Sequence, residues 1–107
     1  MALHVATVSL GLIHMLRPLV QCIRKRDRSL ADQLARAASS IALNVAEADR
    51  SQGGNVLARF HSAAGSASET RMALRVAVAW GYVTEEAAAD AEGHLDRSIA
   101  MLWKLTH

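Results

Sequence analysis

Two short groups of polar side chains are the first candidates for chemistry in this sequence. Ser40, Asn44 and Glu47 are spaced by four and three residues, so a helix places them on one face. Ser66 and Glu69 are three residues apart further along the chain. Polar groups beside an apolar stripe need hydrogen-bond partners, or each one costs about 1–3 kcal/mol. We expect these side chains to bond to one another or to facing backbone; a ligand-binding carboxylate pair and a subunit contact are the alternatives.

The remaining reactive residue types do not form a catalytic or metal-binding pattern. The sequence has no HExxH motif, no close His/Cys cluster and no Glu-x-x-His pairs of the di-iron bundle kind. His61 lies near Ser62, Ser66 and Glu69 in sequence, but no nucleophile elbow or oxyanion loop accompanies them. Gly53-Gly54 lacks the lysine of a phosphate-binding loop and is typical of a turn. We therefore predict a protein that is not an enzyme, with no catalytic residue, metal or cofactor.

Basic residues are the best indication of a binding function. Residues 17–36 contain six basic side chains and two acidic ones. Repeated around a ring of copies, such a patch would form a positive rim for phosphates, whereas alone it could be an ordinary solvated helix end. No aromatic residue for stacking on bases lies within it, so we do not expect sequence-specific recognition of a single strand. The candidate nucleic-acid-binding residues are Arg17, Arg24, Lys25, Arg26, Arg28 and Arg36.

Composition indicates one small domain that associates with copies of itself. The chain has 107 residues, of which 51% are hydrophobic and only 4% aromatic. A domain of this size has a large surface for its volume, so one copy cannot bury all of that apolar surface. Residues 1–83 carry ten Lys/Arg against five Asp/Glu, and residues 84–107 carry two against five. These opposite charges can pair within one copy or between neighbours.

Cellular location is predicted from cysteine usage and from the apolar N-terminal stretch. The single Cys22 excludes an internal disulfide, suits a reducing compartment and is expected in the core. Residues 3–23 are long and apolar enough to raise the question of a membrane span, but Arg17 and Pro18 interrupt them. The start also lacks the basic leader and cleavage site of a signal peptide. We predict a buried helix, no membrane association and a cytoplasmic protein.

Apolar spacing predicts an all-α fold, an antiparallel up-down-up-down four-helix bundle formed by the whole chain, residues 1–107, as one domain. Pro18 should kink the first helix or delay its start. Ser29 is the expected N-cap of the second helix and Thr84 that of the fourth, while Gly81 suits a left-handed C-terminal position after the third. Arg71 and Arg75 are expected to face acidic residues of the fourth helix or of a neighbouring copy. The predicted helices span residues 2–25, 30–50, 56–80 and 85–106.

Two segments carry a resemblance to a known family. QLARAASSIALNVAEA (33–48) and SAAGSASETRMAL (62–74), with AVAWGYVTEE leading into the last helix, resemble the four-helix-bundle proteins encoded in intervening sequences of bacterial 23S ribosomal RNA genes. Related proteins are accessory proteins of diversity-generating retroelements. Ala48 departs from the family's usual glycine, so the second helix could run longer. The family pattern falls on Ser40, Ile41, Asn44, Glu47, Gly65, Ser66 and Glu69.

This resemblance implies a partner-binding assembly without enzymatic activity. It implies a homo-oligomer, typically a ring of five bundles, and for the retroelement relatives binding to nucleic acid and to a reverse transcriptase. Two hypotheses follow. The first is a structural or interaction protein whose assembled surface binds a partner, and the second is a sequence-nonspecific nucleic-acid-binding module that acts through a basic rim.

Overall fold

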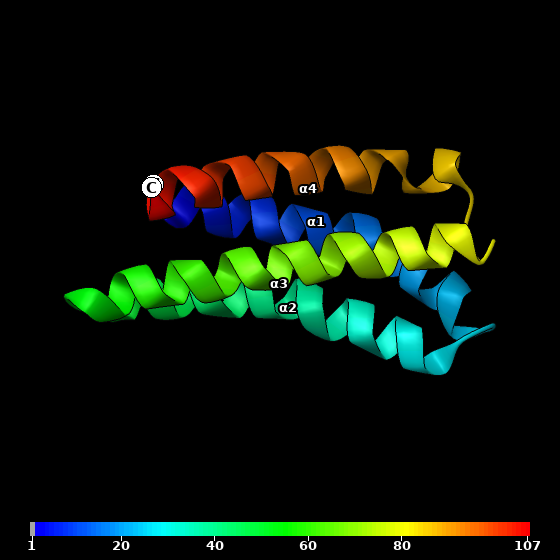
Figure 1. Ribbon diagram of the computed structural model, residues 1–107, viewed down its shortest axis with the longest axis horizontal. Coiled ribbons are helices and arrows are strands. Elements are labelled where there is room, and N and C mark those ends of the chain that lie inside the picture. Colours follow the sequence, from blue (N-terminus) through cyan, green and yellow to red (C-terminus); the bar gives the residue numbers. More distant parts are fainter. Residues whose placement is uncertain (1) are drawn as a thin grey trace.

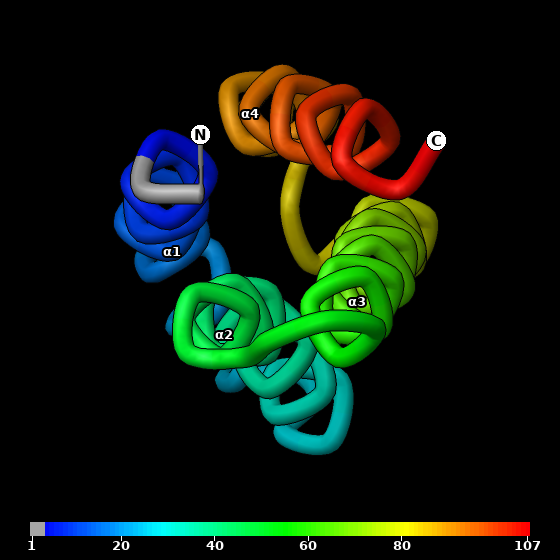
Figure 2. Tube along the Cα trace, turned by 90° about the vertical axis from the view of Figure 1, so that its left-hand side faces the viewer, coloured from blue at the N-terminus to red at the C-terminus, as the bar shows by residue number. Residues whose placement is uncertain are grey.

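Four antiparallel helices form the bundle (Figure 1). A computed structural model describes the backbone of residues 2–107 and the side chains from residue 4 onward. Viewed along the bundle, the helices follow one another around a square, so that α1 lies beside α2 and α4 (Figure 2). The all-α, up-down-up-down architecture predicted from the sequence is confirmed. The helices are α1 (Ala2–Arg24), α2 (Arg28–Arg50), α3 (Gly54–Ala79) and α4 (Glu85–Thr106).

The core follows a heptad-like spacing of buried residues. In α1 the buried positions alternate between steps of four and three residues, which keeps them on the side of the helix that faces the bundle axis. Ser9 is the polar member of this stripe, and its hydroxyl donates to the Val5 carbonyl at 2.8 Å, so burial leaves it with a partner. The stripe consists of Val5, Ser9, Leu12, Leu16, Leu19 and Ile23.

The helix bounds differ from the predicted ones by at most two residues, with α3 already starting at Gly54; three of the predicted end features are confirmed and one is wrong. Thr84 caps α4 by accepting from the Ala87 amide at 3.0 Å, and Gly81 has a positive φ of 77°, both as predicted. The predicted N-cap of α2, Ser29, is wrong: Asp27 caps that helix and accepts from the Leu30 amide at 3.0 Å. A carboxylate two residues earlier captures the same end of the helix, so α2 starts before Ser29. Finally, α2 extends beyond Ala48 to Arg50, as the alanine allowed.

Two expectations for α1 change. Its helix is continuous from Ala2 to Arg24 with Pro18 inside, so the proline does not delay its start. The prediction that Cys22 lies in the core is also wrong, because its side chain is exposed. The buried stripe passes through Leu19 and Ile23, and Cys22 lies on the flank of that stripe.

Opposite charges pair across α3 and α4, as the sequence predicted for the two arginines. Arg71 forms an ion pair with Asp96, and Arg75 Nε lies 3.8 Å from Glu92 Oε1. Part of the charge asymmetry between the chain segments is therefore satisfied inside one bundle.

Candidate functional site

The polar residues between α2 and α3 form a hydrogen-bond network. Ser66 Oγ donates to Ser40 Oγ at 2.8 Å, which joins the two helices near their middle. Asn44 Nδ2 donates to both the hydroxyl and the carbonyl oxygen of Ser40, at 3.0 and 2.9 Å. The buried Thr70 donates to the Ser66 carbonyl at 2.7 Å. The predicted hydrogen bonding among these side chains is present for Ser40, Asn44 and Ser66, and such a network can fix helix register.

The two glutamates lie outside this network. Glu47 and Glu69 are exposed, and within the described part of the chain neither carboxylate has a hydrogen bond or ion pair. Because α2 and α3 are antiparallel and meet at Ser40 and Ser66, the glutamates lie in opposite directions from that contact. With a rise of 1.5 Å per residue, they are separated by about 15 Å along the bundle. Within one copy the two carboxylates are therefore too far apart to bind one ligand together, and among the described residues neither has the hydrogen-bond partner expected from the sequence.

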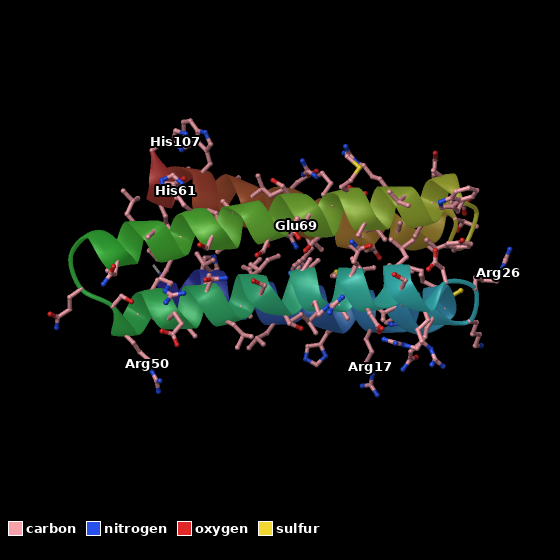
Figure 3. All side chains as sticks on the ribbon, turned by 60° about the horizontal axis from the view of Figure 1, so that its bottom comes forward. Arg17, Arg26, Arg50, His61, Glu69 and His107 are labelled. Carbon is pink, nitrogen blue, oxygen red and sulfur yellow. The ribbon has the colours of Figure 1, made fainter. Side chains whose placement is uncertain are left out.

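His61 and Glu69 likewise do not form a catalytic group with Ser66. His61 is exposed on α3 near the end of the bundle where the chain terminates, and Glu69 lies near the middle of the same helix (Figure 3). The Ser66 hydroxyl donates to Ser40 instead. Among the described residues, no group of three or more His, Cys, Asp or Glu side chains could hold a metal ion.

The six candidate basic residues are all exposed, but they divide into separate places. Arg17 and Arg24 line a groove of about 560 Å³ between α1 and α2, and Arg17 points away from the bundle (Figure 3). Arg24 is engaged in an ion pair with Asp32. Arg36 is exposed on the outer side of α2. The floor of the groove is apolar and consists of Ile13, Leu16, Val20, Ala35 and Ala38.

Lys25, Arg26 and Arg28 form the second place, at the turn between α1 and α2. Arg28 does not share a helix face with Arg17 and Arg24, because α1 ends at Arg24 and Asp27 caps a new helix. Within the described residues, none of these three cations is paired with a carboxylate. Arg26 lies at the very end of the bundle (Figure 3).

An aromatic pair lies beside one of these cations, Arg26, which the sequence did not predict. Tyr82, in the turn between α3 and α4, has its ring centroid 5.5 Å from Arg26 Cζ. The ring of Trp80 stacks on Tyr82, with centroids 6.5 Å apart and 19° between their planes. These aromatics are more than 50 residues from Lys25, Arg26 and Arg28 in the sequence. The up-down topology could have revealed them, because it brings both turns to one end of the bundle (Figure 1).

Tyr82 is held in place by groups from the opposite turn. Its hydroxyl donates to Asp27 Oδ2 at 3.3 Å, and its carbonyl oxygen accepts from Cys22 Sγ at 3.4 Å. Partial burial, then the negative charge of Asp27 and the hydrogen bond to it, raise the pKa of Tyr82, while the Arg26 charge opposes them. We call the surface formed by Lys25, Arg26, Arg28, Trp80 and Tyr82 the paired-turn surface.

Sequence comparison places the chain in a family. The sequence pattern of the 23S rRNA-intervening sequence proteins matches residues 3–104, almost the whole chain. The chain belongs to the 23S rRNA-intervening sequence protein family. No curated protein matches this sequence.

The bundle is also similar to a solved structure of the S23 ribosomal protein family. That protein, from Bacteroides thetaiotaomicron, is described as having unknown function. The two structures align with a TM-score of 0.87 at 20% sequence identity, covering 95% of this chain and 97% of the other. This likeness establishes the shared bundle fold.

The residues predicted to carry the family pattern fall into three structural classes in this 23S rRNA-intervening sequence protein. Ile41 is completely buried in the core, whereas the Ser40 network joins α2 to α3. Gly65 is exposed on α3, and a Cβ added there would meet no atom within 4 Å. Packing inside a single copy therefore requires the isoleucine and the network but not the glycine.

Proposed function

We propose that this chain is a non-enzymatic scaffold that assembles with copies of itself through α1 and holds a partner on the assembled surface. One observation carries the proposal. Residues His4–Arg24 have the length and mean hydropathy, 1.3, of a membrane-spanning helix, yet only 28% of this apolar stretch is buried in one copy. The exposed apolar surface of such a helix needs a further contact that buries it. Arg17 and Pro18 interrupt the apolar stretch, which favours contact with another protein copy over insertion into a lipid bilayer.

Exposed apolar side chains on α1 also support this helix as the interface between copies. Leu10 is 56% exposed, and Met15 is also exposed on this helix. The groove beside Arg17 has a mainly apolar floor and basic residues on its rim, so it can receive an apolar helix edge that carries acidic residues. The first turn of α4 offers exposed Glu85 and Glu86. A ring of five copies, the number that the family resemblance implies, would use a contact of this head-to-tail kind.

The mass of the assembly tests this proposal. We expect multi-angle light scattering to give a multimer at micromolar concentration, and Leu10→Asp to shift it toward single copies without unfolding them. Leu57→Asp is the matched control, because Leu57 is an exposed leucine on α3 rather than on α1. A wild-type chain that remains a single copy would overturn the proposal, as would equal dissociation by both variants.

A second function, sequence-nonspecific nucleic-acid binding, is favoured by the three unpaired cations of the first turn. Lys25, Arg26 and Arg28 are exposed at one end of every copy, where a ring would multiply them into a positive rim. In this role the protein would serve as a cytoplasmic accessory module without a cofactor, with a reverse transcriptase as the protein partner that the family resemblance implies.

Salt-dependent binding tests the second function. Replacing Lys25, Arg26 and Arg28 with Gln should weaken binding to RNA or DNA and reduce the dependence of affinity on salt. The matched control removes three exposed cations elsewhere, Arg50, Arg59 and Lys104; Arg50 lies at the opposite end of the bundle from Arg26 (Figure 3). Equal effects of the two triple variants would show that the turn has no special role.

A further inference from the structure

The paired-turn surface combines an exposed aromatic ring with unpaired cations. Trp80 is 68% exposed although it is one of the largest apolar side chains in the protein. It ends α3 as the C-cap residue, and its ring stacks on Tyr82. Arg26 lies over the Tyr82 ring, so the three side chains form one connected group.

This group is held by bonds that do not involve Trp80. Tyr82 is anchored to α1 and the following turn by Cys22 Sγ and Asp27 Oδ2, and to α3 by its amide, which donates to the Ala77 carbonyl at 2.9 Å. The Asp27 carboxylate also caps α2, so one residue fixes both the turn and the tyrosine. Trp80 is thus presented to solvent on a preorganised support, which lowers the entropy lost when a ligand binds.

We propose that Trp80 stacks on unpaired bases of a single-stranded nucleic acid while Lys25, Arg26 and Arg28 bind its phosphates. Every base has a π face, so stacking on tryptophan tolerates any sequence, and neighbouring cations follow the backbone. Duplexes keep their bases stacked inside and can use only the cations. The surface should therefore prefer single strands without selecting a sequence. This inference rests on the nucleic-acid-binding function proposed above.

Acidic residues at the same end determine where the strand lies. Glu85 and Glu86 begin α4 directly after the turn that contains Tyr82, and Glu85 lines a groove with Arg75 on the α3–α4 side. A phosphate chain would be repelled there, so we place it on the side of Lys25 and Arg28. Glu86→Gln should consequently tighten single-strand binding several-fold rather than weaken it.

The second tryptophan provides an internal control. Trp103, on α4, is 58% exposed, but its ring already stacks on His107 with centroids 4.4 Å apart. It lies at the opposite end of α4 from the paired-turn surface, with Lys104 as the adjacent cation in sequence. The two tryptophans are the only ones in the sequence, so a Trp103→Phe chain reports Trp80 fluorescence alone.

Fluorescence titration with a 20-nucleotide oligo(dT) tests the stacking. We expect saturable quenching in Trp103→Phe and little change in Trp80→Phe, where Trp103 is the reporter. Trp80→Ala should weaken single-strand binding roughly tenfold and leave binding to a duplex of the same length unchanged. Trp103→Ala should change neither, and thermal melting should show that both alanine variants remain folded.

The possible outcomes separate this inference from the functions on which it rests. If the wild type binds oligo(dT) and Trp80→Ala binds it equally well, stacking is wrong but nucleic-acid binding stands. If neither oligo(dT) nor the duplex binds at low salt, both the stacking inference and the nucleic-acid-binding function are wrong. The self-assembly proposal is unaffected by that result. If Trp80 fluorescence changes with protein concentration alone, the ring lies between copies and the proposed ligand is wrong.

Discussion

Gly11 of α1 lies directly against the imidazole ring of His94 on α4. A Cβ built at Gly11 would come within 2.9 Å of His94 Nε2, which is closer than such contacts normally allow. The His94 ring is also within hydrogen-bond distance of Arg97, at 2.6 Å between Nδ1 and Nη2. The absence of a side chain at Gly11 therefore sets how closely α1 and α4 approach at this point.

This contact predicts that the effect of Gly11→Ala depends on His94. Alanine stabilises an interior helix position by about 1 kcal/mol relative to glycine, but here His94 must move to admit it. We expect a smaller gain, or a loss, in the wild type and the full gain in a His94→Ala background, as measured by urea unfolding. Gly93→Ala is the control, because nothing lies within 4 Å of its added Cβ. Equal effects of Gly11→Ala in both backgrounds would contradict the coupling.

The Ser40 network predicts unequal effects of its two serines. Ser40→Ala removes the acceptor for Ser66 and one of the two acceptors for Asn44, so it should destabilise the fold by about 1–2 kcal/mol. Ser66→Ala leaves Ser40 bonded to Asn44 and should cost about half as much. Ser39→Ala, an exposed neighbour bonded only to the Ala35 carbonyl, should be close to neutral. Denaturant unfolding measures all three, and a larger loss for Ser66 than for Ser40 would contradict this arrangement.

The raised pKa of Tyr82 predicts that the folded protein loses stability in alkaline solution. Its pKa is raised in the folded protein by partial burial and by Asp27, so folding favours the protonated hydroxyl. That contribution is complete below the unfolded pKa of about 10 and is lost as the pH rises through the higher folded value. Tyr82→Phe should lack this part of the alkaline destabilisation.

Tyrosinate absorbance measures this directly, since Tyr82 is the only tyrosine in the sequence. Asp27→Asn keeps an oxygen that can cap α2 but removes the charge, so it should lower the pKa of Tyr82 toward its ordinary value. A titration midpoint that is the same in the wild type and in Asp27→Asn would show that the carboxylate does not act on the phenol.

Local signals were sufficient to predict the helices and several of their ends. The periodic apolar positions, the Thr84 cap and the left-handed Gly81 each depend on residues within one or two turns. The error at Ser29 has a local origin, since Asp27 competes for the same helix end with a charged acceptor. Cys22 lies among apolar residues on more than one side of α1, so their spacing alone does not determine which side faces the core.

The candidate site was predicted only in part, because it joins residues that are distant in the chain. The six basic residues could be found as a local excess, but their division among the groove, the turn and the outer side of α2 depends on where α1 stops. Trp80 and Tyr82 reach this turn through tertiary topology. Sequence spacing also suggested that the glutamates share the serine network, whereas the antiparallel packing of α2 and α3 directs Glu47 and Glu69 apart.

The two ion pairs between α3 and α4 should contribute unequally to the stability of the fold. The Arg71 side chain is 26% exposed and its Nε is buried without a partner, so its pairing with Asp96 satisfies a cation that water reaches poorly. The Arg75 side chain is 58% exposed and lies 3.8 Å from Glu92, where solvent screens the attraction. Asp96→Asn should therefore destabilise the fold by about 1 kcal/mol, and Glu92→Gln by less than about 0.5 kcal/mol.

Salt distinguishes these two pairs further. Raising the ionic strength should remove most of the small Glu92 effect, because exposed charges are screened within about 10 Å at 0.1 M salt. The Asp96 effect should persist, since the amide that replaces the carboxylate leaves a half-buried guanidinium with a weaker acceptor. Urea unfolding of both variants at low and high salt measures the difference. If Asp96→Asn proves as mild and as salt-sensitive as Glu92→Gln, burial of Arg71 does not strengthen its ion pair.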